Sequence, residues 1–304
     1  MKTGTNYIFE KGQSDASELR RLISKGIVVA PGVFNGISAL VAENHGFRAL
    51  YLSGSGIAGS MGLPDLSLTS LNEVVEETRR IKLVSALPLI VDVDTGFGEV
   101  LNVERTVREI ERAGASAIHM EDQILPKKCG HLEGKKLVAA EEMIEKIQAA
   151  SKSRMNKDFT IIARTDARSV EGIDAAIERA RLYLRAGADG IFPEALESKE
   201  EFKEFSQKVN GILMANMTEY GRSPLLSVDE LEKLGYSIVI FPLTAFRGAL
   251  KKMDEIYSNL AKNGTQRNML NEIMTRKDYY ELINYSSYEL EDKKLKEKST
   301  KIME

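Results

Sequence analysis

The sequence predicts a single (β/α)₈ barrel of the TIM type, and three features of the chain lead to this prediction. Short apolar runs rich in β-forming residues alternate eight times with segments of helical periodicity. Glycines stand where several of these helical segments should end. Polar residues follow the apolar runs in step with the eightfold register. This regular alternation fits a closed barrel better than an open doubly wound sheet.

The apolar runs are the expected strands, and the segments that follow them have the 3.6-residue period of helices packed on a sheet. The strands are predicted at 27–33, 49–53, 88–94, 117–121, 159–165, 190–194, 212–217 and 237–242. Glycine adopts the left-handed conformation that ends many helices, so it marks helix ends independently of hydrophobicity. The glycines that precede four of the strands are Gly46, Gly114, Gly187 and Gly235.

Three segments lie outside the repeated units. An N-terminal extension over 1–26 contains a helical pattern from Asp15 to Lys25, which we expect to cover the bottom of the barrel. The barrel domain is predicted over 27–288 and includes two helices after the last strand, at about 243–262 and 265–283. The stretch 289–304 is almost entirely charged or polar, which is typical of a disordered tail.

Composition restricts the classes of function. The 42 basic and 45 acidic residues give a net charge of -3, which argues against nucleic-acid binding. The single cysteine excludes an internal disulfide. The first residues lack the apolar core of a signal peptide, and no apolar run is long enough to span a membrane. The sequence therefore predicts a cytoplasmic protein whose partner is a small molecule.

The only cysteine, Cys129, lies in the polar segment Lys127 to His131. Neighbouring positive charge lowers the pKa of a thiol, so this segment predicts a proton donor or a nucleophile. The alternative is a buried structural thiol, the usual state of a free cysteine. Two lysines, a glycine and a histidine around the thiol favour the functional interpretation.

Acidic residues gather at the predicted ends of two strands. Asp92 and Asp94 are two positions apart, so their side chains leave the strand on one face, and Glu121 ends the next strand. Three carboxylates at one rim repel each other unless a cation neutralises them, and Mg²⁺ suits a small set of oxygen ligands. The alternative is a pair of solvated aspartates in a loop that turns at Gly96 and Gly98.

Two further strand ends carry groups that bind anions. Ser53, Gly54 and Ser55 follow the second strand in a glycine-rich loop that can cradle a carboxylate or phosphate, although such runs also form ordinary turns. Arg164 ends an apolar strand, where an unpaired charge would be costly. Its partner is expected to be either Glu194 or a carboxylate of the substrate.

Asn216 and Thr218 share a face of the seventh strand and can donate hydrogen bonds to a carboxylate. His45 and His119 have no metal-ligand partner at suitable spacing, so we expect them to be packing or turn residues.

Together these residues resemble the isocitrate lyase and phosphoenolpyruvate mutase superfamily, and within it the methylisocitrate lyase branch. The resemblance covers about Ile27 to Tyr288. The mutases carry an asparagine-serine pair in place of the cysteine, so Cys129 indicates a carbon–carbon lyase. The motifs that carry the resemblance lie at 51–54, 62–65, 91–98, 127–131, 163–167, 192–195, 216–219 and 241–247.

The resemblance implies an Mg²⁺-dependent lyase, with Mn²⁺ as a second possible metal, that cleaves 2-methylisocitrate to pyruvate and succinate by retro-Claisen chemistry in propionate catabolism through the methylcitrate cycle. Phe192 and Leu243 are inferred to leave room for the extra methyl group of this tricarboxylate. The family is typically a homotetramer that swaps a helix after the barrel between subunits. The alternatives are isocitrate, 2,3-dimethylmalate or oxaloacetate as substrate, or a barrel without activity.

The resemblance also implies a role for each site residue. Asp92 holds the metal directly, and Asp65, Asp94 and Glu121 hold it largely through waters. Cys129 donates a proton to the carbanion, which Lys128, His131, Arg164 and Asn216 stabilise, and the base is Tyr51 or a water bound to a carboxylate. Bacterial relatives often have arginine where this chain has Lys128. The implied substrate-binding residues are Ser53, Gly54, Ser55, Asp92, Gly130, Arg164, Glu194, Asn216 and Thr218.

The loop that carries Cys129 is rich in glycine and charge, so we expect it to open for substrate and to close for the reaction.

Overall fold

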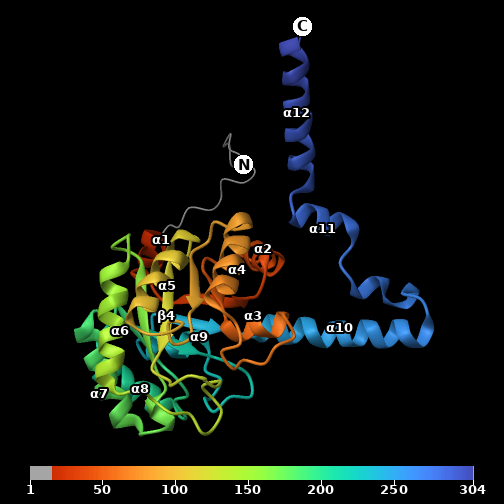
Figure 1. Ribbon diagram of the computed structural model, residues 1–304. Helices are drawn as coiled ribbons and strands as arrows, with labels where there is room; N and C mark the ends of the chain where they lie inside the picture. The colour runs from red at the N-terminus through yellow and green to blue at the C-terminus, as the bar shows by residue number, and fades with distance from the viewer. Residues whose placement is uncertain (1–15, 304) are drawn as a thin grey trace. The chain divides into compact units, whose positions relative to one another are not determined.

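A computed structural model describes residues 16–303 and confirms the predicted barrel (Figure 1). Eight parallel strands follow one another around the barrel in chain order, and β1 closes it by pairing with β8. Each observed strand lies within its predicted range. The strands are β1 Val28–Val33, β2 Leu50–Leu52, β3 Leu89–Asp92, β4 Ala117–Glu121, β5 Thr160–Thr165, β6 Gly190–Pro193, β7 Ile212–Asn216 and β8 Ile238–Phe241.

Helices follow the strands and cover the outside of the barrel (Figure 1). The four glycines expected to end helices have φ values of +83°, +100°, +112° and +90° in chain order, which confirms the left-handed turns. The helices of this part are α2 Gly36–Asn44, α3 Gly54–Ser60, α4 Leu71–Val84, α5 Val100–Arg112, α6 Ala140–Ser153, η2 Ala167–Ser169, α7 Ile173–Ala186, α8 Lys199–Lys208 and α9 Val228–Lys233.

The inside of the barrel is filled from below by α1, Ala16–Ile23. Leu19 and Leu22 of this helix pack with inward-facing strand residues such as Val28 and Ile238 in one buried cluster. The predicted cover at the bottom of the barrel is therefore confirmed from residue 16 onward, and the rest of the N-terminal extension lies outside the described residues. Because apolar side chains fill the lower layers, polar groups of the barrel interior collect at the carboxyl ends of the strands.

The chain after β8 forms four further elements, coloured blue in Figure 1. They are α10 Thr244–Asn263, η3 Arg267–Glu272, α11 Arg276–Leu282 and α12 Tyr285–Met303. Contacts group the chain up to Phe246 as one compact unit and the chain from Arg247 onward as another, so the domain predicted over 27–288 divides within α10. In agreement with this division, none of the α10 residues is buried in the part of the chain that the structure describes.

The expected disorder of 289–304 is wrong for the described residues, since α12 continues to Met303. Opposite charges recur at helical spacing in this segment. Lys296 lies 2.6 Å from Asp292, and Lys293 lies 3.9 Å from Glu297. Such pairs four residues apart stabilise a helix that has no apolar face. Among residues 16–303, no helix combines the length and the apolar character needed to cross a membrane.

A close approach between β1 and β8 gives a test of barrel closure. A Cβ atom built on Gly32 would lie 2.0 Å from the carbonyl oxygen of Pro242. We expect Gly32→Ala to lower the free energy of unfolding by about 1–3 kcal/mol, as overpacking does in other cores. Urea unfolding followed by circular dichroism measures this loss. The matched control is Gly248→Ala in α10, where nothing lies within 4 Å of the added Cβ; equal unfolding midpoints for the two variants would contradict the close approach.

Candidate active site

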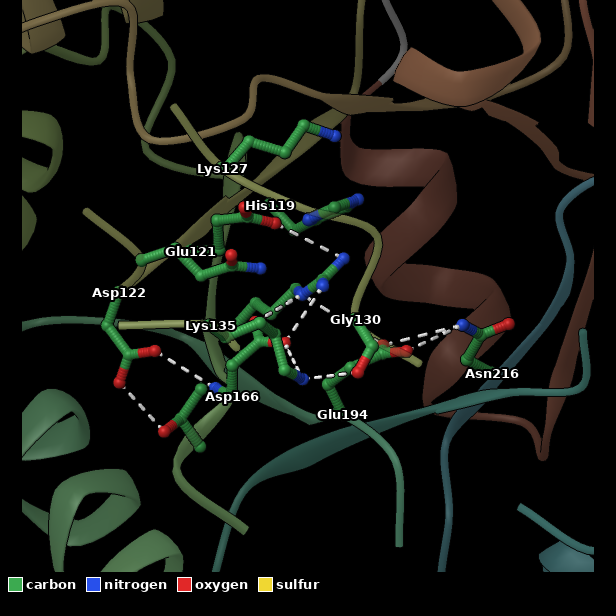
Figure 2. A network of polar contacts seen from close by, with 12 residues as sticks. His119, Glu121, Asp122, Lys127, Gly130, Lys135, Asp166, Glu194 and Asn216 are labelled. Atoms are coloured by element: carbon green, nitrogen blue, oxygen red, sulfur yellow. Dashed lines mark hydrogen bonds and ion pairs between the residues drawn. The ribbon is translucent and has the colours of Figure 1, made fainter. Parts of the chain in front are cut away.

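The strand register brings the polar residues at the barrel rim into neighbouring pairs. Asp92 at the end of β3 lies beside His119 of β4, and Glu121 at the end of β4 lies beside Arg164 of β5. Parallel strands place their carboxyl ends at one end of the barrel, so these side chains meet there (Figure 2). The sequence-predicted neighbourhood of Asp92, Asp94 and Glu121 is reproduced, since the Glu121 backbone N–H donates to the Asp94 carbonyl at 2.9 Å.

Backbone groups hold the first carboxylates of the rim in place. The Asp92 carboxylate accepts hydrogen bonds from the backbone N–H groups of Gly54 and Asp94, each at 3.1 Å. Asp94 has a φ of +48°, an uncommon left-handed conformation for a residue with a side chain. The Lys127 ammonium lies 2.9 Å from Asp94 Oδ1 and 2.5 Å from Asp65 Oδ1. A buried cation of the chain therefore lies between two of the predicted metal ligands.

Burial is the main influence on the pKa values of these acidic residues. Burial raises the pKa of Asp94 to about 6 and raises that of Glu121 well above its usual range. Burial also opposes ionisation of Asp92, but the charges of Lys127 and Arg164 and the backbone N–H of Asp94 hold its pKa below the ordinary value. The buried Asp94 Oδ1 and both Glu121 oxygens accept no hydrogen bond from the described residues. Asp94 Oδ1 is nevertheless paired with the Lys127 ammonium at 2.9 Å, and Glu121 Oε2 is paired with Arg164 at 3.2 Å.

These observations decide whether the residues fit a metal. Carboxylate oxygens are the ligands that Mg²⁺ and Ca²⁺ prefer. Carboxylate oxygens of Asp65 and Asp94 lie around the Lys127 ammonium, and a hard divalent cation could bind such oxygens. Within residues 16–303, no three His, Cys, Asp or Glu side chains converge on one point as a metal would require. The donor set therefore fits a hard divalent cation in chemistry, whereas its present arrangement surrounds an ammonium.

His119 belongs to this site, although the sequence predicts only a packing or turn role for it. Its Nε2 lies 2.7 Å from the Tyr51 hydroxyl and 3.6 Å from Asp92. Burial lowers the pKa of His119 to about 4, so the ring is neutral and can accept the Tyr51 proton in a hydrogen bond. The spacing of His119 from other possible metal ligands did not predict this place. His119 lies two residues before Glu121, so both side chains leave β4 on the same face, and this pattern could have placed His119 in the site. His45 follows the end of α2, as expected of a turn residue.

Arg164 has a partner that the sequence analysis left out. Its Nε lies 2.9 Å from Asp166 Oδ2, whereas it lies 3.9 Å from Glu194, and its Nη1 lies 3.2 Å from Glu121. Burial opposes ionisation of Asp166, but Arg164 and Lys135 lower the pKa of its carboxyl group. Of the two expected partners, the structure provides the protein carboxylate, and it adds Asp166 as the closer one.

Asp122 fixes the end of β5 that carries these groups. Its carboxylate accepts a hydrogen bond from the Asp166 backbone N–H at 2.9 Å (Figure 2). It also accepts from the hydroxyl groups of Thr165 and Tyr183, each at 2.8 Å. Both Asp122 and Asp166 stand at predicted strand ends, so their position was readable from the sequence. Their role was not, because it depends on partners distant in the chain.

The loop between β4 and α6 lays Gly130 and His131 against Glu194 after β6 and Asn216 at the end of β7. His131 Nε2 lies 2.8 Å from Glu194, and Asn216 donates to the same carboxylate at 3.2 Å. The Arg222 backbone N–H donates to His131 Nδ1 at 3.0 Å. This donor fixes the tautomer, because Nδ1 must accept and Nε2 must therefore carry the proton.

The predicted direction of the Cys129 pKa shift is wrong. Burial raises the pKa of the thiol above its ordinary value, and a backbone hydrogen bond from His131 only partly offsets this. The two flanking lysines point elsewhere: the Lys127 ammonium pairs with Asp65 and Asp94, and that of Lys128 lies 3.4 Å from the Glu133 carbonyl. At neutral pH Cys129 is consequently a protonated thiol, which suits a proton donor and not a thiolate nucleophile.

The remaining predicted residues also lie at this rim, apart from the Lys128 ammonium. A Cβ atom on Gly130 would lie 2.3 Å from Glu194 Cγ and 2.5 Å from Arg164 Nη2, so only glycine allows this approach. Ser53 is buried directly before α3, and Thr218 is buried after β7. Ser55 lies in the first turn of α3.

The chain is similar in sequence to proteins of one known family. Residues 19–261 match the family model described as phosphoenolpyruvate phosphomutase. The chain belongs to the phosphoenolpyruvate phosphomutase family. One relative in this family, 2-methylisocitrate lyase of Aeropyrum pernix, is 53% identical over 286 residues, which are 94% of this chain and 92% of the relative. Further relatives of that name are 43–45% identical.

Solved structures of the phosphoenolpyruvate phosphomutase family share the fold. The crystal structure of 2,3-dimethylmalate lyase has a TM-score of 0.88 at 35% identity and covers 93% of this chain and 95% of its own. A phosphonopyruvate hydrolase solved with oxalate and Mg²⁺ has a TM-score of 0.83 at 31% identity and covers 91% of this chain and 98% of its own.

The raised pKa of Cys129 gives a direct test, because the chain has one cysteine. Only the thiolate reacts with iodoacetamide, so alkylation of the folded protein should reach half its maximal rate at a pH above the ordinary thiol value. The urea-unfolded protein, measured in parallel by mass spectrometry, is the control and should react faster at pH 8. Faster alkylation of the folded protein at that pH would contradict the protonated thiol.

Proposed function

We propose that this protein is an Mg²⁺-dependent lyase that cleaves 2-methylisocitrate to pyruvate and succinate. The observation that carries the proposal is a protonated thiol on a turn packed against Arg164 and Glu194, at the same barrel rim as four carboxylates. Retro-Claisen cleavage needs a proton donor for the carbanion and a cation for the hydroxyl side of the substrate. The similarity to lyases of that name supports this choice of substrate.

The metal is assigned to Asp92, Asp94, Asp65 and Glu121, with Mn²⁺ as an alternative to Mg²⁺. When bound, it supplies Lewis acidity that polarises the substrate hydroxyl and favours its deprotonation. The buried Glu121 Oε1, which accepts no hydrogen bond from the described residues, supports this assignment. The phosphonopyruvate hydrolase structure that holds Mg²⁺ supports it independently.

The proton reaches the leaving carbon from Cys129. As the carbon–carbon bond breaks, its electron pair stays on the succinate fragment, and the S–H proton of Cys129 neutralises that carbanion. The thiolate that remains accepts the His131 backbone hydrogen bond. Arg164, His131 and Asn216 are assigned to the succinate carboxylates, because they are donors that gather around Glu194 beside the turn. Lys128 is left out of this set, since its ammonium lies by the Glu133 carbonyl.

Of the two candidate bases, the structure favours a water held by the carboxylates over Tyr51. Burial, and next the charge of Asp92, raise the pKa of Tyr51 well above its usual range, so the phenol stays protonated. Its hydroxyl lies 2.7 Å from His119 Nε2, which makes Tyr51 a hydrogen-bond donor. We assign Tyr51 to orienting the substrate and not to removing its proton.

The other end of the substrate is assigned to the residues around the start of α3. Ser53 and Ser55 would bind the pyruvate carboxylate, while the Gly54 N–H donates to Asp92. Thr218 and Gly130 complete the set at the succinate end, and Glu194 orients its three donors there. Phe192 and Leu243 are proposed to accommodate the extra methyl group, which discriminates by only about 1–3 kcal/mol.

A substrate panel tests the activity. Purified protein with Mg²⁺ is incubated with 2-methylisocitrate, isocitrate, 2,3-dimethylmalate or oxaloacetate, and the products are identified by NMR. We expect the highest kcat/KM for 2-methylisocitrate, with release of pyruvate and succinate, and loss of turnover in excess chelator. A preference for any other member of the panel, or turnover insensitive to chelation, would overturn the proposal.

Cys129→Ser separates proton donation from binding. The hydroxyl is a far weaker acid than the thiol, so kcat should fall by about 10²–10⁴-fold, the usual worth of a general acid. Mg²⁺ binding, measured by calorimetry, should stay within about threefold of wild type because Cys129 is not a ligand. A variant with near-normal kcat would remove Cys129 from the acid role.

We also propose a cytoplasmic homotetramer in which the helices after the barrel pack on neighbouring subunits. The support is that α10 buries no residue among residues 16–303 and exposes Leu250, Met253, Tyr257 and Leu260. Light scattering should give a tetramer. Replacing Met253 and Tyr257 together by Glu should shift the mass toward smaller species, and a monomeric wild type would refute the proposal.

A further inference from the structure

We propose that Lys135 positions the proton donor by holding the peptide group between Gly130 and His131 so that its N–H points at the Cys129 sulfur. The inference deepens the proposed lyase function and rests on it for the identity of the reaction. Lys135 is a positioning residue, since it acts on the thiol through a peptide and not through the substrate. Three sets of contacts carry the inference.

The first set joins Lys135 to the turn that carries the thiol. Its ammonium donates to the Gly130 carbonyl oxygen and, at 2.7 Å, to Asp166 Oδ1 (Figure 2). The Lys135 side chain is 1% exposed, so neither contact is replaced by bulk water. A buried ammonium is costly unless its acceptors are well placed. Asp166 also binds Arg164. Of these two cations, only Lys135 donates to the Gly130 carbonyl.

The second set joins the same peptide to the sulfur. The Gly130 carbonyl and the His131 N–H belong to one planar unit and point in opposite directions. The His131 N–H donates to Cys129, and the Leu132 N–H closes the turn on the Cys129 carbonyl at 2.9 Å. A rotation that frees the carbonyl from Lys135 would therefore turn the N–H away from the sulfur.

The third set fixes Lys135 itself. The stretch after it pairs with the start of the loop: the Ile124 N–H donates to the Lys136 carbonyl at 2.8 Å, and Gln123 and Leu137 form an antiparallel bridge. Its other acceptor, Asp166, is fixed by Arg164 and Asp122. Lys135 thus reaches from the rigid base of the loop to its reactive turn.

The charged groups that face Cys129 show how Lys135 acts. Glu194 and Asp65 disfavour the thiolate, whereas Arg164 and a hydrogen bond from the His131 backbone N–H favour it. The Lys135 charge is matched by Asp166 at 2.7 Å. Proton transfer leaves a thiolate, which is stabilised by a hydrogen-bond donor. Loss of Lys135 should therefore raise the pKa of the thiol, because the peptide N–H no longer points at the sulfur.

The test uses the single cysteine as its reporter. In Lys135→Met, iodoacetamide alkylation of Cys129 measured without substrate or metal should shift its midpoint upward by about one pH unit. With 2-methylisocitrate and Mg²⁺, kcat should fall about tenfold or more while KM stays within about threefold. The matched control is Lys136→Met, which removes an adjacent exposed lysine and should behave as wild type in both assays.

Lys135→Arg keeps a cation of similar reach and should recover most of the wild-type alkylation profile and kcat. An unshifted profile in a Lys135→Met protein that melts at the wild-type temperature would overturn the inference, as would a shift shared by Lys136→Met. Should Lys135→Met not fold, Lys135→Gln and Lys135→Arg are compared in the same two assays. If both variants have the alkylation profile and the kcat of the wild type, the inference is overturned. Alkylation needs no substrate, so the alkylation assay tests the role of Lys135 separately from the substrate panel, which tests the lyase activity.

Discussion

The buried guanidinium of Arg164 is the interaction on which the arrangement of the rim depends. It lies within 4.0 Å of carboxylates from three consecutive parts of the barrel: Glu121 at the end of β4, Asp166 after β5 and Glu194 after β6. Without this cation, three buried carboxylates would face one another with little solvent to screen them. The strand register enforces the meeting, because it sets Arg164 directly beside Glu121 and Phe192.

From this centre two groups of opposite character extend along the rim. Toward β2 and β3 the carboxylates outnumber the cations, and Lys127 is drawn in among them. Toward β6 and β7 the Glu194 carboxylate is surrounded by donors from His131, Asn216 and Arg164. A substrate with carboxylates at one end and a metal-binding hydroxyl at the other matches this division. The loop between β4 and α6 lies over both groups, since it carries Lys127 to one and Cys129 with His131 to the other.

Much of this was predictable from the sequence because it depends on local pattern. Hydrophobic periodicity located all eight strands, and the rule that parallel strands end at one side placed Asp92, Glu121, Arg164 and Asn216 together. What failed depended on where long side chains point. Lys127 and Lys128 flank the thiol in sequence, but neither ammonium lies beside it, so burial and not charge sets the direction of the Cys129 pKa.

The same limit explains the other differences. His119 looked isolated because its partner, Tyr51, comes from another strand. The roles of Lys135 and Asp166 arise from a contact across 31 positions that no local pattern reports. The helix α12 was missed because charge alone suggested disorder, whereas the spacing of opposite charges supports a helix.

The protonated state of Cys129 has a consequence beyond proton transfer. Peroxide and other oxidants attack the thiolate far faster than the thiol, and they convert it to sulfenic and higher acids, which no longer carry the S–H group. Burial and the surrounding carboxylates keep the sulfur in the slow-reacting form until the reaction itself removes its proton. The environment that keeps the proton on Cys129 therefore also slows oxidation of the sulfur in the resting protein.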